Sequence, residues 1–122
     1  MSLANALLAA ILLDGSDNHS LGFSIDLVVG GGETRLVIRG EIDLIVRDEL
    51  ARALDDAVTP GGRVVLDVTD VSFLDSTGLG ELARAAAGGC EIVVLNPQSA
   101  VRRALEVSGL DHIVHVAERG ED

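Results

Sequence analysis

The sequence contains no lysine, and it has only two phenylalanines, two prolines and one cysteine among its 122 residues. Without lysine, the chain lacks the Gly-x-x-x-x-Gly-Lys loop that cradles nucleotide phosphates. Its net charge is −11 and its arginines are scattered apart from the pair Arg102-Arg103, which argues against the basic surface that nucleic-acid binding requires. The single cysteine, Cys90, cannot form an internal disulfide, so nothing indicates an oxidising compartment. We expect Cys90 to be a small residue at the mouth of a strand.

The chain also has no hydrophobic run that is long enough to cross a membrane. The apolar stretch at residues 3–13 is about half of the roughly 20 residues needed, and it lacks the positively charged start of a secretory signal. Its aliphatic residues follow helical spacing, so we expect a short helix that is marginal alone. This helix must pack on its own domain, form a homodimer with a second copy, or stay disordered. We therefore divide the chain into an N-terminal extension, residues 1–20, and one domain, residues 21–122.

What the chain has in abundance is aliphatic residues, and 48% of it is hydrophobic. Apolar residues at every second position predict strands, and apolar residues at i, i+3, i+4 and i+7 predict helices. Strands are expected at residues 23–29, 34–39, 63–68, 90–95 and 112–116. Helices are expected from Asp43 to Thr59, from Ser76 to Gly88, and over residues 101–108, where Gly109 is the stop signal. We expect Gly40 to Asp43 to break the second strand, and Asp43 to cap the following helix.

The order of these segments predicts an α/β fold with a mixed central sheet. A short glycine-rich link joins the first two strands, which is typical of an antiparallel hairpin. The later strands alternate with helices, and such units require right-handed crossovers and parallel pairing. Because no helix separates the first two strands, we expect the helices to lie mainly on one face of the sheet.

The residues give little support to catalysis or metal binding. Ser76 lies in Leu-Asp-Ser-Thr-Gly, which lacks the first glycine of a Gly-x-Ser-x-Gly nucleophile elbow and has no evident His-acid pair. Asp67 follows a buried strand without the second aspartate that an aspartyl-phosphate phosphatase uses. On a strand, His112 and His115 would point to opposite faces and would not share a metal. We therefore predict no enzymatic activity, no cofactor and no metal.

Two adjacent hydroxyls, Ser76 and Thr77, open the second expected helix. They suit a helix cap, a nucleophile or a phosphorylation site, and a cap alone contributes about 1 kcal/mol. Gly78 and Gly80 in the first turn each cost about 1 kcal/mol relative to alanine, yet they would let another protein's backbone approach. A phosphate beside Asp75 would gain the helix amides and meet a like charge, so it would strongly change a docking surface.

Three motifs carry a family resemblance. They are Gly40-Glu41-Ile42-Asp43, then Leu66-Asp67-Val68-Thr69-Asp70-Val71-Ser72-Phe73-Leu74-Asp75-Ser76-Thr77-Gly78-Leu79, then Asn96-Pro97 followed by Val101-Arg102-Arg103-Ala104-Leu105-Glu106-Val107-Ser108-Gly109-Leu110. In this order and at this spacing they resemble the bacterial anti-sigma-factor antagonists, which are STAS domains. The resemblance runs from about Phe23 to Val116 and implies the STAS fold.

The resemblance implies a cytoplasmic regulator in a partner-switching pathway, not an enzyme. Unphosphorylated members bind an anti-sigma factor that is also a serine kinase, and this binding releases the sigma factor. The kinase uses ATP to phosphorylate the serine that matches Ser76, and a PP2C-type serine phosphatase removes the phosphate. The residues that match the partner-binding surface are Glu41, Asp43, Asp75, Ser76, Thr77, Gly78 and Leu79.

The chain departs from the family pattern in two places. Leu44-Ile45-Val46-Arg47 is more apolar than the small and polar residues usual there, and only residues 117–122 stand where members have a further helix. Residues 3–13 are a candidate cover for the surface this leaves. Asp67 also matches the family motif, and its place after a buried strand suggests that it holds the next loop. The alternative function is a STAS interaction subunit of a signalling scaffold or an ABC-type lipid-transport complex, without serine phosphorylation.

Overall fold

The computed structural model of the chain describes residues 22–30 and 33–118. The expected helix at residues 3–13 and its linker lie outside the described residues, as do the middle of the glycine-rich link and the last four residues of the chain. Within the described part, one five-stranded sheet has the strand order β1-β2-β3-β4-β5. Its strands are β1 (Ser24–Gly30), β2 (Glu33–Ile42), β3 (Arg63–Leu74), β4 (Glu91–Leu95) and β5 (His115–Ala117). The α-helices are α2 (Arg47–Ala57), α3 (Ser76–Ala87) and α4 (Ser99–Ser108), and the short 3₁₀ helices are η2 (Leu44–Val46) and η3 (Leu110–His112).

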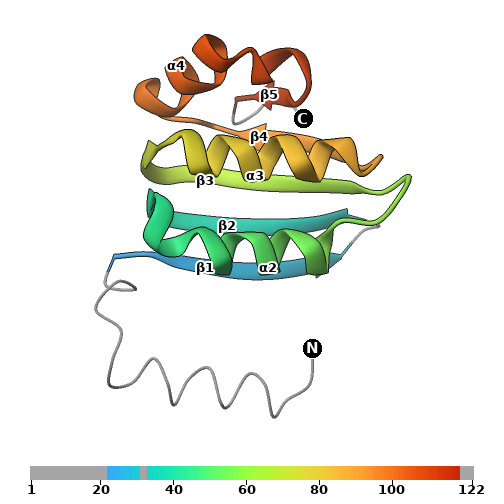
Figure 1. Cartoon of the computed structure of the whole chain (residues 1–122). Helices are drawn as coiled ribbons and strands as arrows, with labels where there is room; N and C mark the ends of the chain where they lie inside the picture. The colour runs from blue at the N-terminus through green and yellow to red at the C-terminus, as the bar shows by residue number, and fades with distance from the viewer. Residues whose placement is uncertain (1–21, 31–32, 119–122) are drawn as a thin grey trace.

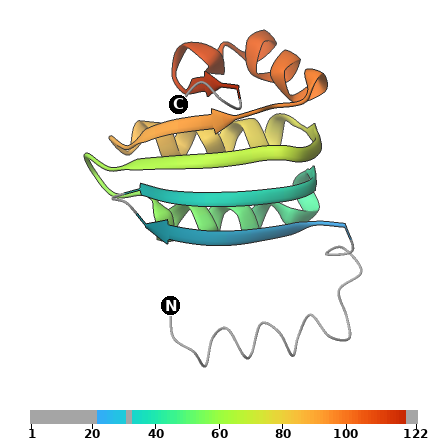
Figure 2. The same ribbon diagram turned by 180° about the vertical axis from the view of Figure 1, so that it is seen from behind.

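The sheet is mixed, as the sequence predicts. β1 pairs with β2 in antiparallel fashion, whereas β2, β3, β4 and β5 pair in parallel. Helices α2 and α3 lie side by side on one face (Figure 1), and the view from behind shows the strands in front of them (Figure 2). Side chains of α2, α3 and α4 join those of the strands in one aliphatic core. These observations confirm the α/β class and the placement of helices mainly on one face.

The two central strands are longer than predicted. Gly40 to Ile42 do not break the second strand, because they continue its pairing with β3 up to Ile42 and Leu74. The pairing register shifts on either side of Gly40, whose φ of +102° suits glycine. The irregularity is therefore a bulge within a continuing strand, and the second motif segment is extended up to Leu74.

The three α-helices form where the sequence predicts them, with differences at their ends. Asp43 caps η2, accepting a hydrogen bond on Oδ1 from the amide of Ile45 at 3.0 Å, and α2 follows directly. α4 ends at Gly109 with φ +80°, the left-handed cap that the sequence predicts. The last strand begins at His115 and not at residue 112, because residues 110–112 form η3. Cys90 is buried just before β4.

The face of the sheet opposite α2 and α3 has its own small buried cluster. Val65, Val93, Leu95 and Ala117 form it. Within the described ranges, no helix of the structure is long and apolar enough to span a membrane.

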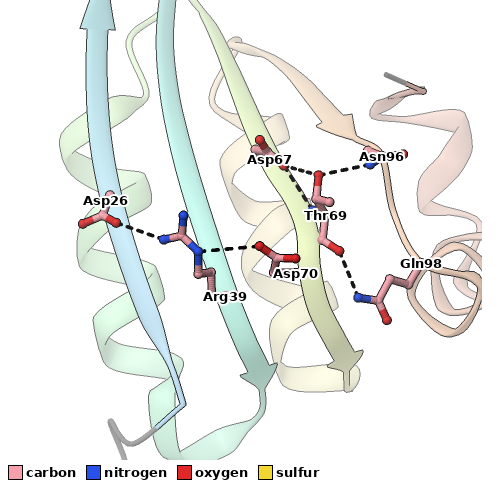
Figure 3. Close-up of polar contacts among 7 residues, drawn as sticks. All are labelled: Asp26, Arg39, Asp67, Thr69, Asp70, Asn96 and Gln98. Carbon is pink, nitrogen blue, oxygen red and sulfur yellow. Dashed lines mark hydrogen bonds and ion pairs between the residues drawn. The ribbon is translucent and has the colours of Figure 1, made fainter. Parts of the chain in front are cut away.

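Ion pairs cross the first three strands. Arg39 of β2 lies 3.2 Å from Asp26 of β1 (Nη1 to Oδ2) and 3.6 Å from Asp70 of β3 (Nε to Oδ2) (Figure 3). All three side chains are at least half exposed, so we expect each pair to contribute little to stability.

Candidate functional site

The candidate site lies at the carboxyl ends of β2 and β3, where α3 begins. Glu41 pairs with Phe73, and Ile42 pairs with Leu74. The amide of Asp75 then donates to the carbonyl of Ile42 at 3.1 Å, which extends the pairing by one residue. Glu41 and Ile42 therefore meet residues that lie more than thirty positions later in the sequence at one edge of the sheet.

Asp75, and not a hydroxyl, caps α3. Its Oδ1 accepts a hydrogen bond from the amide of Gly78 at 3.1 Å, while its backbone is extended. Ser76 and Thr77 are the first two residues of the helix, so the interpretation of either as its cap is wrong. Ser76 is exposed, and its hydroxyl makes no hydrogen bond with any residue that the structure describes. Because Asp75 supplies the cap, the Ser76 hydroxyl is not needed to hold the helix start.

The two glycines of the first turn have different surroundings. A Cβ atom on Gly78 would lie 2.6 Å from Cγ2 of Ile42 and would also overlap the side chain of Leu74. Gly78 is buried, and its missing side chain lets α3 pack on the ends of β2 and β3. A Cβ atom on Gly80 would meet nothing within 4 Å, and Gly80 is exposed. Internal packing therefore explains Gly78, whereas Gly80 lies on open surface.

An apolar and acidic surface surrounds this edge. Leu44 and Ile45 are 67% and 66% exposed, and Phe73 is 47% exposed. Ile45 lines a groove of about 410 Å³ together with Glu41 and Asp43. The large exposed side chains are those that another protein would cover.

A buried carboxylate ties the start of α2 to α3. Glu81 is 7% exposed and accepts hydrogen bonds from Nε of Arg47 at 3.4 Å and from Nη2 of Arg84 at 2.9 Å. The pKa of the Arg84 guanidinium is raised, mainly by its hydrogen bond to Glu81 and secondly by its hydrogen bond to Asp55. Sequence reasoning missed this cluster, because only the packing of α2 against α3 brings Arg47 within reach of Glu81.

A second polar cluster lies farther back along β3 (Figure 3). Asp67 Oδ1 accepts from the hydroxyl of Thr69 at 2.6 Å and from its amide at 3.1 Å. Asn96, whose φ is +59°, donates to the same hydroxyl at 3.1 Å, and Gln98 donates to the Thr69 carbonyl at 2.9 Å. Asp67 therefore holds the chain that follows it, as predicted. The sequence did not show that the Asn-Pro motif is the partner of this threonine.

The structure thus gathers most of the predicted site residues at one edge. Glu41 and Ser76 are exposed, while Asp43, Asp75 and Thr77 are half-buried. Gly78 is interior, and Leu79 is partly buried against the core.

The two histidines do not lie on one strand as expected. His112 ends η3 and His115 opens β5. Over residues 22–30 and 33–118, no group of three or more His, Cys, Asp or Glu side chains is arranged to hold a metal ion.

Comparison with known proteins agrees with this geometry. The family model described as "Mlab, STAS domain" matches residues 25–115. The anti-sigma-B factor antagonist of Staphylococcus aureus (strain NCTC 8325 / PS 47) is 30% identical over 89 residues, which cover 69% of this chain and 82% of that protein.

Solved structures of anti-sigma factor antagonists also share the fold. The protein from Mycobacterium paratuberculosis superposes with a TM-score of 0.67 at 26% identity, over 78% of this chain and 85% of that chain. Unphosphorylated SpoIIAA superposes with a TM-score of 0.56 at 27% identity, over 80% and 91%. The phosphorylated form of SpoIIAA from Bacillus gives 0.51 at 25% identity, over 81% and 94%. With the motifs, the mixed sheet and these relatives in agreement, the chain belongs to the STAS-domain family of anti-sigma-factor antagonists.

Proposed function

We propose that this protein binds an anti-sigma factor kinase in the cytoplasm through the edge formed by β2, β3 and the start of α3. In this role the chain is a binding partner and a kinase substrate, not an enzyme. Phosphorylation of Ser76 ends the binding, and a PP2C-type phosphatase restores it. The observation that carries the proposal is the exposed Ser76 hydroxyl, which is not used by the helix cap and follows the exposed Phe73 by three residues in the chain. The solved phosphorylated form of the relative SpoIIAA supports a phosphorylation switch.

The unphosphorylated surface suits a partner of complementary chemistry. Leu44, Ile45 and Phe73 offer apolar contact area, and Glu41 and Asp43 add negative charge beside it. We expect the partner to present apolar side chains flanked by arginine or lysine, since opposite charges speed association and fix orientation.

Phosphorylation would change this surface abruptly. The kinase would transfer the terminal phosphoryl group of ATP to Ser76 Oγ, so that an O–P bond forms, ADP leaves and the hydroxyl proton is lost. The phosphate adds about 1.5 to 2 negative charges at neutral pH. The Asp75 carboxylate already accepts the Gly78 amide, so the phosphate would meet a like charge at the helix start. A partner that fits the neutral hydroxyl would lose its fit.

The decisive experiment incubates the protein with the candidate kinase and ATP and measures intact mass. We expect one phosphate on the natural protein and on Thr77→Ala, and none on Ser76→Ala. Thr77→Ala is a matched control, because it removes the neighbouring hydroxyl and leaves Ser76. Phosphate on Thr77, or on neither residue with any kinase of the host, would contradict the proposal. Ser76→Ala should stay bound to the kinase when ATP is added, whereas the natural protein should be released.

A second candidate is a STAS interaction subunit of a signalling scaffold or an ABC-type lipid-transport complex, with Ser76 left unmodified. The observation in its favour is that the matching family model is described by the name Mlab. A stable complex with such an assembly, unaffected by ATP and by Ser76→Asp, would favour this candidate over the phosphorylation switch.

A further inference from the structure

Strand β1 carries an apolar surface that no helix in the described ranges covers completely. β1 is one of the two edge strands of the sheet, and Leu27 and Val29 are 54% and 71% exposed. Beside it runs a groove of about 280 Å³. The groove is lined by Ile25, Leu27, Leu36, Glu49, Arg52, Ala53 and Asp56.

The groove continues the main core beyond α2. Leu27 pairs with Leu36 across the hairpin, and Ile25 pairs with Ile38, so these side chains share the helix-covered face. Leu36 and Ile38 are buried in the main core, whereas Leu27 extends past it. Figure 1 shows α2 over β1 and β2, and α3 on its other side. One more apolar segment beside α2 would complete the layer.

We propose that residues 3–13 of this same chain dock into the groove between β1 and α2. These residues contain no charged side chain, and their leucines and isoleucine recur at helical spacing. As a helix of about 1.5 Å per residue they would be about 16 Å long, similar to the eleven-residue α2 that forms one wall.

The position of the segment in the chain favours this occupant. Ten residues separate Leu13 from the start of β1 at Ser24, and they can span up to about 33 Å. The segment can therefore reach any part of the groove, and such a tether gives an effective concentration on the order of millimolar.

A second copy of the protein is a weaker occupant. Each copy carries a net charge of −11, which opposes self-association, whereas the uncharged segment brings no repulsion to the groove. The charged groups that line the groove are Glu49, Arg52 and Asp56, so it offers no excess of positive charge to attract another acidic surface. Docking of residues 3–13 does not depend on the proposed function, because the residues that line this groove are not among those proposed to bind the partner.

The test uses the full chain with a single introduced tryptophan. The natural sequence has no tryptophan or tyrosine, so Leu8→Trp provides one indole whose emission reports its surroundings. We expect blue-shifted emission that is independent of protein concentration. Adding Leu27→Asp in the groove should shift the emission to the red, and Ala53→Arg should do the same from the opposite wall. Adding Val107→Asp is the matched control, since Val107 is 79% exposed on α4 and should leave the emission unchanged.

Hydrogen exchange of the chain with its natural residues 3–13 provides a second readout. We expect amides of residues 3–13 to be protected in the natural protein and to lose protection in Leu27→Asp, but not in Val107→Asp. Three results would overturn the proposal. The first is red-shifted emission of a solvated indole together with unprotected amides in residues 3–13. The second is emission that neither Leu27→Asp nor Ala53→Arg changes. The third is a buried indole that becomes exposed on dilution in a protein that has the mass of a dimer. The last result would assign the groove to a second copy.

Discussion

Two hydroxyl residues on the same stretch of chain, Thr69 and Ser76, are placed in opposite situations. Each lies shortly after an aspartate whose side chain accepts a hydrogen bond from a backbone amide. Asp67 accepts from the amide of Thr69, and Asp75 accepts from the amide of Gly78 at the start of α3. The Thr69 hydroxyl donates to Asp67 and accepts from Asn96, so its hydrogen-bonding capacity is used within the protein. Ser76 is exposed, and the side chain of the preceding residue, Asp75, accepts its hydrogen bond from the Gly78 amide and not from Ser76.

The difference shows how a structural site and a candidate interaction site can be distinguished within one motif. Removing a hydroxyl that makes hydrogen bonds within the protein lowers the free energy of unfolding. A hydroxyl that the fold does not use can be modified without disturbing the fold. We therefore expect Thr69 to matter for stability and Ser76 for regulation.

The largest effect on stability is expected from Thr69→Val. The change keeps the shape of the side chain and the amide bond to Asp67, but it removes the hydroxyl that bonds Asp67 and Asn96, which should lower the free energy of unfolding by about 1–3 kcal/mol. Ser76→Ala is the matched change at the exposed hydroxyl and should stay within about 0.5 kcal/mol of the natural protein. Urea unfolding of both variants measures the difference, and equal losses would remove the distinction between the two sites.

The next effect separates the two glycines of the first turn of α3. Gly78→Ala places a Cβ against Ile42 and Leu74, and overpacking of this kind costs about 1–3 kcal/mol. Gly80→Ala adds a methyl group in open space and should gain up to about 1 kcal/mol of helix stability. Thermal unfolding compares them directly. A stabilised Gly78→Ala variant would show that the first turn is not packed as tightly as the structure indicates.

A third prediction concerns partner binding. Phe73→Ala should weaken the complex with the anti-sigma partner by at least about 1 kcal/mol, which is the usual threshold for an interface residue that matters. Ile113→Ala serves as a control, because Ile113 is 62% exposed near the start of β5 and far from the Ser76 edge along the chain. Titration calorimetry of both variants tests whether the apolar surface beside Ser76 takes part in binding. Equal affinities would exclude Phe73 from the interface.

The smallest expected effect separates two roles of the Asp75 side chain, which caps α3 and carries a negative charge. Asp75→Ala removes the cap of α3 and should cost about 1 kcal/mol of stability, whereas Asp75→Asn keeps a cap of similar quality. If the carboxylate also contributes to partner binding through its charge, both variants should bind more weakly by a similar factor. Weaker binding of the alanine variant alone would assign Asp75 a purely structural role.

Much of the fold was predictable because its strands and helices have clear periodicities. The mixed sheet, the hairpin, the stripe of α2 and the stop at Gly109 are all confirmed, whereas the buried face of α3 is centred on Gly78, Glu81, Leu82 and Ala85. The predicted ends of the strands were wrong where hydrogen bonding to a neighbouring strand overrides the local conformational preference of the residues. Gly40 is a breaker by composition, yet it continues β2 as a bulge because β3 supplies its pairing. Residues 69–74 look irregular alone, yet β2 holds them extended.

By itself, the sequence determined the alternation of elements, the aliphatic core and the presence of an acid and two hydroxyls at the start of one helix. Tertiary structure decided which of these groups is used internally. Asp75 takes the cap because the Ile42 carbonyl holds its amide, Gly78 is required because Ile42 and Leu74 lie against it, and Glu81 is paired because α2 brings Arg47 across. Such roles depend on distances between residues that are remote in the chain. Local periodicity carries no information about those distances, which is why the different surroundings of Ser76 and Thr69 become visible only in the folded protein.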